Sequence, residues 1–347
     1  MPGTPRSRWL AWLAALALAT VAGCPPPGDD DDAGDDDGAD DDTGDDDSGD
    51  DDTADDDTGD DDTIEPLVCP EGGKPQTLGT VEHGEIDETS GIAESRDQPG
   101  VLWVHNDSGD GPVLYALTTD GVHLGEYTVA DVPSWDWEDL ALGRDPKSGK
   151  SMLYAADIGD NNQVRSEVYV IRVAEPDVSP EQKPVEEELE GTVMTLTYPG
   201  GEAFNAEILL ADPLTDDLFI VTKDGGGYTR VFRKPPPHVA DQEAEVELVA
   251  ELDFWQAPLA GGSTTGGDIS PLGQWVVIRT YGTTAYVWLW DRALSLAEAL
   301  AADPCTVELP GEQQGEAICF AADSRGLYTI SEGVSQPVHH VPLTVAP

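Results

Sequence analysis

Acidic residues recur at similar places in five related stretches of this sequence. Each stretch starts with small or acidic residues, continues as an apolar run, turns tightly and returns as a second apolar run with a polar end. Aligning the stretches brings four carboxylates to one repeat position: Asp139, Glu207, Asp268 and Glu316. Converging carboxylates repel one another unless a metal ion, a shared proton or a cation neutralises them, so their pKa values become perturbed.

Two interpretations fit these four acids. As catalytic groups they would meet at a central channel and hydrolyse a substrate, either with a metal ion or as an acid and base pair. As structural groups they would accept hydrogen bonds from backbone amides and link neighbouring repeats. The structural interpretation is favoured, because a repeat copies such a link into every unit.

A second group of candidate ligands follows the second run of the first two stretches. Its members are Asp107, Asp110, Asp157, Asp160 and Asn161. Carboxylate and amide oxygens around tight turns could ligate Ca²⁺, which prefers oxygen ligands. Turn chemistry alone also explains these residue types and is the favoured interpretation. Ca²⁺ is therefore the cofactor to test, and the sequence indicates no other.

Other residue types are less informative. Lys223 and Arg279 end two further second runs and could add positive charge to the same channel. Residues 135–139 hold two tryptophans, which indicate core packing, the favoured interpretation, or an aromatic platform for a sugar. The Gly-x-Ser-x-Gly motif of α/β-hydrolases is absent. None of the histidines shows His-x-x-x-His or His-x-His zinc spacing: His83, His105, His123, His238, His339 and His340.

The elements that carry these residues are predicted to be strands. The apolar runs are rich in β-branched and aromatic residues and are bounded by Gly, Pro and Asp. Repeated units of several short strands are typical of β-propellers. We predict an all-β fold, a β-propeller of five four-stranded blades. Six blades are the alternative, with the extra one at residues 176–190, but this stretch lacks apolar alternation and is predicted to be an insertion.

The last stretch supplies only three predicted strands, at residues 317–321, 327–331 and 338–343. A lone strand at residues 75–83 precedes the first stretch. We predict that this N-terminal strand completes the last blade. Closure with strands from both ends of the chain removes the exposed edges that an open sheet would leave.

The N-terminal segment has a different composition. Residues 1–23 contain Arg6 and Arg8, an apolar run and small residues, a pattern typical of a secretory signal peptide and too short for a membrane-spanning helix. Residues 21–24, Val-Ala-Gly-Cys, resemble the lipobox of bacterial lipoproteins. The resemblance implies that Cys24 carries a lipid and anchors the chain in the bacterial cell envelope, at the outer membrane or cell surface. A plain signal peptide with an incidental cysteine is the alternative.

Residues 24–63 consist mainly of triplets of Asp separated by small residues. Such a segment has no apolar surface to bury and its charges repel one another, so we expect a disordered tether. Weak Ca²⁺ binding is the alternative role. Residues 64–347 are predicted to form the propeller domain.

The formal net charge is −53 at pH 7, and residues 64–347 stay strongly acidic without the Asp-rich segment, which argues against binding nucleic acid or anionic lipid headgroups. Besides the membrane reached through Cys24, the expected partner is an unidentified extracellular ligand or protein, and we expect a monomer. With Cys24 acylated, Cys69, Cys305 and Cys319 allow one disulfide and one free thiol in an oxidising compartment. Pairing of Cys305 with Cys319 and pairing of Cys69 with Cys305 both remain open.

Several runs resemble a group of uncharacterised secreted bacterial propeller proteins. They are residues 90–93, 102–110, 136–141 and 153–161. More distantly they are similar to esterase-like phytase and gluconolactonase-type propellers, whose metal ligands have no match here. A five-bladed ring is also similar to arabinanase-like glycosidases, which use carboxylates from separate blades.

The function predicted first is a surface-tethered binding or interaction module, stabilised by calcium. The alternative is an extracellular hydrolase, either a metal-assisted phosphoesterase or lactonase or a glycosidase, so the sequence leaves enzymatic activity open.

Overall fold

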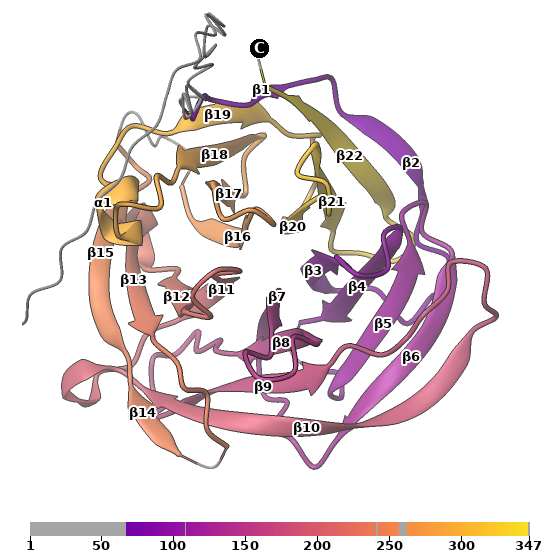
Figure 1. Ribbon diagram of the computed structural model, residues 1–347, viewed down its shortest axis with the longest axis horizontal. Coiled ribbons are helices and arrows are strands. Elements are labelled where there is room, and N and C mark those ends of the chain that lie inside the picture. Colours follow the sequence, from indigo (N-terminus) through magenta and orange to yellow (C-terminus); the bar gives the residue numbers. More distant parts are fainter. Residues whose placement is uncertain (1–66, 108, 241, 257–261, 346–347) are drawn as a thin grey trace, which may run out of the picture. The chain divides into compact units, whose positions relative to one another are not determined.

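Four-stranded antiparallel units surround a common centre in this protein (Figure 1). The computed structural model describes residues 67–107, 109–240, 242–256 and 262–345. The predictions for residues 1–23, for Cys24 and for residues 24–63 therefore lie outside the described residues. Within the described part, no helix is long and apolar enough to cross a membrane.

Each unit is a blade, and in the first four blades the strands run outward from the centre in chain order. The first blade consists of β3 (Thr89–Glu94), β4 (Val101–Asn106), β5 (Val113–Thr118) and β6 (His123–Ala130). The second consists of β7 (Trp137–Arg144), β8 (Ser151–Asp157), β9 (Val168–Ala174) and β10 (Val185–Thr197). The third consists of β11 (Ala206–Ala211), β12 (Leu218–Thr222), β13 (Tyr228–Lys234) and β15 (Glu247–Asp253), with the short β14 (Glu243–Glu245) beside β10. Turns of Pro, Gly and Asp separate these strands, as expected from their backbone preferences.

The remaining blades follow the same pattern. The fourth consists of β16 (Thr264–Ile269), β17 (Trp275–Thr280), β18 (Thr284–Leu289) and β19 (Cys305–Glu308), and α1 (Leu296–Leu300) lies between its last two strands in the chain. The fifth consists of β20 (Gly315–Phe320), β21 (Gly326–Ser331), β22 (Pro337–Thr344) and β2 (Gln76–Thr80), with β1 (Glu71–Gly72) pairing the other end of β22. The innermost strands contact their neighbours in a closed ring, β3 to β7, β11, β16, β20 and back to β3. The propeller fold is thus confirmed, whereas the number of five blades stays a prediction from the sequence.

Apolar side chains between neighbouring blades hold the ring together. The buried clusters of the described residues each join two successive blades, and one of them joins the last blade to the first. In that cluster Ile92 of β3 lies with Ala317 of β20 and Val338 of β22. Burial of apolar surface on both faces of each sheet is the main stabilising contribution, about 25 cal/mol per Å².

The predicted ring closure is confirmed by β2. It pairs antiparallel with β22, so strands from both ends of the described chain share one sheet. A disulfide between Cys69 and Cys305 joins the segment before β1 to β19, and Cys319 is a buried free thiol. The sequence left two disulfide pairings open, and the structure contains Cys69–Cys305 and not Cys305–Cys319.

The segment at residues 176–190 differs from its prediction. It is not wholly an insertion, because β10 already begins at Val185. The first half of β10 pairs parallel with β6 of the first blade, and the second half pairs antiparallel with β9. The residues of the first half are mostly exposed glutamates, so they show no apolar alternation, although backbone pairing makes them a strand.

Candidate functional site

Every innermost strand has a β-bulge near its start, which leaves one extra residue in that strand. In β7, for example, Trp137 pairs with Asp157 and Asp139 with Ala156, so Glu138 is the extra residue. The equivalent extra residues of the other blades are Ser90, Glu207, Thr265 and Glu316. The polar residues at matching positions are therefore three glutamates, one serine and one threonine.

The predicted alignment of Asp139, Glu207, Asp268 and Glu316 is corrected by these bulges. Asp139 lies one residue beyond the bulge of its strand and Asp268 three residues beyond, whereas Glu207 and Glu316 occupy the bulges. The error arises because sequence spacing does not reveal where a strand holds an extra residue. The four acids therefore form two different pairs.

Asp139 and Asp268 link successive blades. Asp139 accepts hydrogen bonds from the amide of Leu140, at 2.8 Å, and from the amide of Leu209 in the next blade, at 2.9 Å. Asp268 likewise accepts from Ile269 and from Phe320 of the next blade, at 2.7 and 2.9 Å. Such a carboxylate satisfies amides of two sheets at once.

Burial raises the pKa of both linking carboxyl groups. The pKa of Asp139 is well above its usual range, and that of Asp268 is about 6, although the backbone hydrogen bonds and the charge of Arg96 near Asp268 act in the opposite direction. The contacts of these two acids are those of structural links between blades.

Glu207 and Glu316 belong to a polar chain near the centre. Lys223 Nζ lies 3.0 Å from Glu207 Oε2 and donates to the hydroxyl of Tyr281 at 3.0 Å. That hydroxyl donates in turn to Glu316 Oε1 at 2.8 Å. Asn205 adds a hydrogen bond to Glu207 Oε1 at 2.9 Å. This series of contacts connects Glu207 and Glu316, the bulge residues of two blades. Lys223 adds positive charge beside these acids, as its place after a second strand indicated.

Asp107 connects two groups of carboxylates at this end of the ring. It follows β4, and one of its oxygens lies within 4.8 Å of oxygens from Glu316 and Glu332, all three being mutually this close. A second group within the same limit contains Asp107, Asp136 and Glu138. The acidic centre, as we call these five residues, draws on three blades: the bulge residues Glu138 and Glu316 and three residues next to strand ends. Oxygen atoms at such spacing suit a hard divalent cation.

Mutual repulsion and burial favour the protonated forms of Glu138, Glu332 and the nearby Glu207. Burial, then the charges of Glu207 and Asp107, raises the pKa of Glu138 well above its usual range. Burial and the charge of Glu316 raise the pKa of Glu332 to about 8. Glu207 has a pKa of about 7, because burial outweighs the attraction of Lys223. A bound cation would reverse this preference by stabilising the ionised carboxylates.

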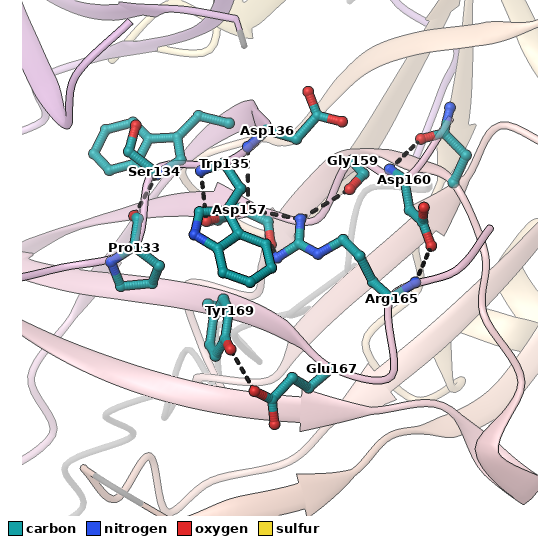
Figure 2. A network of polar contacts seen from close by, with 12 residues as sticks. Pro133, Ser134, Trp135, Asp136, Asp157, Gly159, Asp160, Arg165, Glu167 and Tyr169 are labelled. Carbon is teal, nitrogen blue, oxygen red and sulfur yellow. Dashed lines mark hydrogen bonds and ion pairs between the residues drawn. The ribbon is translucent and has the colours of Figure 1, made fainter. Parts of the chain in front are cut away.

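The predicted calcium ligands do not meet at one point. Figure 2 shows Asp157 paired with Arg165, whose Nη1 lies 2.7 Å from Asp157 Oδ1, and the same carboxylate accepts from the amides of residues 135 and 136. Asp160 accepts from the backbone amide of Arg165 at 2.7 Å. Asp110 accepts from Asn106, and Asn161 accepts from Asn205 at 3.4 Å.

Among the described residues, the possible ion-holding groups include Asp107 from that prediction but none of its three other acids. The carboxylate of Asp157 is used by Arg165 and by the amides of residues 135 and 136, and the carboxylate of Asp160 is used by the amide of Arg165. Figure 2 also shows the Asp136 carboxylate pointing away from Arg165.

The two tryptophans of residues 135–139 have different environments. Trp137 is buried and donates its indole N–H to the carbonyl of Pro133, as expected for core packing. Trp135 is 66% exposed and stacks over Arg165, 5.4 Å from the guanidinium carbon to the ring centroid. The core prediction is therefore wrong for Trp135, which offers an aromatic surface beside the acidic centre's Asp136.

Comparisons with known proteins give the fold alone. No family model and no curated protein matches the sequence. One similar solved structure is the β-propeller domain of Cps50 (Swd1) from Myceliophteria thermophila, with 11% identity, a TM-score of 0.42, and coverage of 78% of this chain and 100% of that one. Another is a gluconolactonase from Xanthomonas campestris, with 13% identity, a TM-score of 0.42, and coverage of 80% and 96%. The RRP9 WD40 repeats show 10% identity, a TM-score of 0.39, and coverage of 80% and 100%.

Proposed function

We propose that this propeller is a binding module whose acidic centre takes up Ca²⁺. The observation that carries the proposal is the position of Asp107, whose carboxylate belongs to two groups of three acids with ligand atoms within 4.8 Å of one another. Carboxylate oxygens are the ligands that Ca²⁺ prefers, and it accepts irregular geometry and water as further ligands. An extracellular ligand with oxygen donors would complete the coordination.

Charge and burial support this role. Glu138 and Glu316 are almost fully buried, and burial raises the pKa of Glu138 well above its usual range. Buried acids of this kind are costly to ionise without a counter-charge. Lys223 compensates Glu207 through its 3.0 Å contact, but Glu207 lies outside the two groups of three. A divalent cation would supply positive charge to the acidic centre, whereas Lys223 pairs with Glu207 outside it.

A hydrolase is the second candidate, favoured by one observation. Glu207 has a pKa of about 7 because burial outweighs Lys223, and it is connected to Glu316 through Lys223 and Tyr281. A carboxyl group with a pKa near neutrality can act as a general acid or base. This role requires turnover of a phosphoester, lactone or glycan that the Glu207→Gln variant abolishes.

The proposal also includes the location of the protein. We propose that Cys24 carries a lipid and that the chain is anchored in a bacterial cell envelope as a monomer. The support is the Val-Ala-Gly-Cys sequence and the Asp-rich segment that follows it. Mass spectrometry of the protein purified from membranes would show a lipid-modified Cys24, and an unmodified cysteine after residue 23 would contradict the anchor.

Calcium calorimetry on the full chain tests the binding role. We expect one saturable site in the wild type, above the weak uptake of the Asp-rich segment, and loss of that site in Asp107→Asn. Asp177→Asn is the matched control, because it removes one exposed carboxylate outside the acidic centre. Equal isotherms for the wild type and Asp107→Asn would contradict the proposal.

A further inference from the structure

Two histidines and one glutamate meet outside the acidic centre, at the outer side of the ring. His83 lies between β2 and β3, and His123 and Glu126 lie on β6. One ligand atom from each of the three residues lies within 4.8 Å of the other two. His83 Nε2 is 3.2 Å from Glu126 Oε1, and the two imidazole rings stack with their centroids 4.1 Å apart. β2 and β6, the strands beside this cluster, are outermost strands of neighbouring blades (Figure 1).

A β-bulge places His123 and Glu126 on one side of β6. In a regular strand, residues three apart point to opposite faces. Here Leu117 of β5 pairs with His123 and Ala116 pairs with Gly125, so Leu124 is an extra residue and the alternation is shifted by one. Leu124 is buried, whereas His123 and Glu126 are both half-buried. The bulge thus brings an imidazole and a carboxylate to the same surface.

The backbone on both sides of His83 is fixed. The amide of Val81 donates to the carbonyl of Gln336 at 2.9 Å, and the amide of Glu82 donates to the carbonyl of Gly121 at 3.0 Å. Ile86 is fully buried, and its amide donates to the carbonyl of His83 at 3.2 Å. The segment therefore presents His83 to β6 from a defined position.

One nitrogen of each histidine in this cluster lacks a hydrogen-bond partner. The Nε2 atoms of His83 and His123 are both buried and neither forms a hydrogen bond, so the 3.2 Å contact with Glu126 is not aligned as one. Buried polar atoms without partners are uncommon and costly. Neutral imidazole is the form of histidine that binds metals. Two unpartnered nitrogens beside a carboxylate are what a metal ion would satisfy.

We propose that His83, His123 and Glu126 bind a transition-metal ion of the Zn²⁺ type. Imidazole nitrogen favours Zn²⁺ over Ca²⁺, which prefers oxygen ligands, so this site differs in chemistry from the acidic centre. Three protein ligands leave a fourth position for water. The Glu85 carboxylate lies 3.8 Å from His83 Nε2. The ion would join the segment after the closing strand β2 to the outer strand of the first blade.

Zinc competition with a chromophoric chelator on the metal-free full chain tests this site. We expect one site per chain in the wild type, with affinity lowered at least tenfold in His123→Gln and in Glu126→Gln. His339→Gln is the matched control, because this histidine of β22 contacts Thr77 of β2 but is not in the cluster. It should keep wild-type affinity, as should Asp107→Asn. Wild-type zinc affinity in both cluster variants would overturn the proposal.

A second measurement does not depend on the variants folding. Co²⁺ added to the wild-type chain should give the visible absorption bands of nitrogen-ligated cobalt, and one equivalent of Zn²⁺ should abolish them while excess Ca²⁺ should not. Zn²⁺ should also raise the melting temperature of the wild type and of His339→Gln. Absence of the cobalt bands would overturn the proposal, as would their removal by Ca²⁺.

Discussion

Individual carboxyl groups in this protein have different roles, and the residues around each group determine its role. Asp139 is bound by amides of two blades and acts as a link, whereas Glu138, the next residue toward the N-terminus, faces other acids at the centre. The sequence places these two side by side, and only the bulge separates their roles. The chemistry of the site therefore depends on the position of individual residues within a strand and not on the number of acids.

The raised pKa values predict that the metal-free protein loses stability as pH increases from about 6.5 to about 8.5. Glu207 and Glu332 have pKa values of about 7 and about 8 when folded, above the usual 4.5. The folded state therefore holds protons that the unfolded state has already released, and this contribution to stability disappears as pH rises through the folded-state values. Histidines, with an unfolded pKa near 6.5, contribute mainly at lower pH.

Urea unfolding at several pH values measures this effect. Glu332→Gln should flatten the decrease in the free energy of unfolding across that range, because its amide does not titrate. If our functional proposal is right, Ca²⁺ should also flatten it. A wild-type stability that rises between pH 6.5 and 8.5 would contradict the assignment of protonated acids.

At the scale of elements, strands were predictable and their local irregularities were not. The alternating β-branched runs indicated the strands and the closing role of β2, because apolar periodicity and turn residues follow directly from burial. The bulge at Glu138 has no periodic signature, so Asp139 was aligned instead. The same limit hid the pair His123 and Glu126, whose spacing suits neither a regular strand nor a helical zinc motif.

Close backbone approach makes one glycine of the closing strand irreplaceable. A Cβ at Gly79 of β2 would lie 1.9 Å from the carbonyl oxygen of Asp120, and neither group can rotate away. Gly79→Ala should therefore lower the free energy of unfolding by about 1–3 kcal/mol or more, the usual cost of overpacking. Gly84→Ala is the control, because no atom lies within 4 Å of the corresponding Cβ. Equal denaturant midpoints for the two variants would contradict this close contact.

At the scale of the whole molecule, the ring is closed by two independent connections. One is the pairing of β2 with β22, and the other is the disulfide between Cys69 and Cys305, which spans 236 residues of sequence. The sequence left two disulfide pairings open because pairing depends on which blades become neighbours. Ring closure brings the segment before β1 close to β19, and so selects the partner of Cys69.

Reduction of the Cys69–Cys305 disulfide should destabilise the propeller but leave it folded. A loop of this length corresponds to a loss of up to about 5 kcal/mol in the chain-entropy model. The melting temperature with and without reductant measures the change. Cys69→Ser should have the melting temperature of the reduced wild type, and reductant should not alter it. The thiol of Cys319 should stay unmodified by alkylating reagents in the native state, because burial raises its pKa. No change on reduction would contradict a stabilising disulfide.

The position of Cys69 also decides how the ring responds to mechanical force. Cys69 precedes β1 and β2 in the chain, so tension on the chain before it passes through the disulfide to Cys305 in β19 of the fourth blade. The hydrogen bonds between β2 and β22 then carry none of this load, and the closing strand is not peeled from the sheet. In a reducing environment the same force would act on β1 and β2. The ring would then open by separation of β2 from β22.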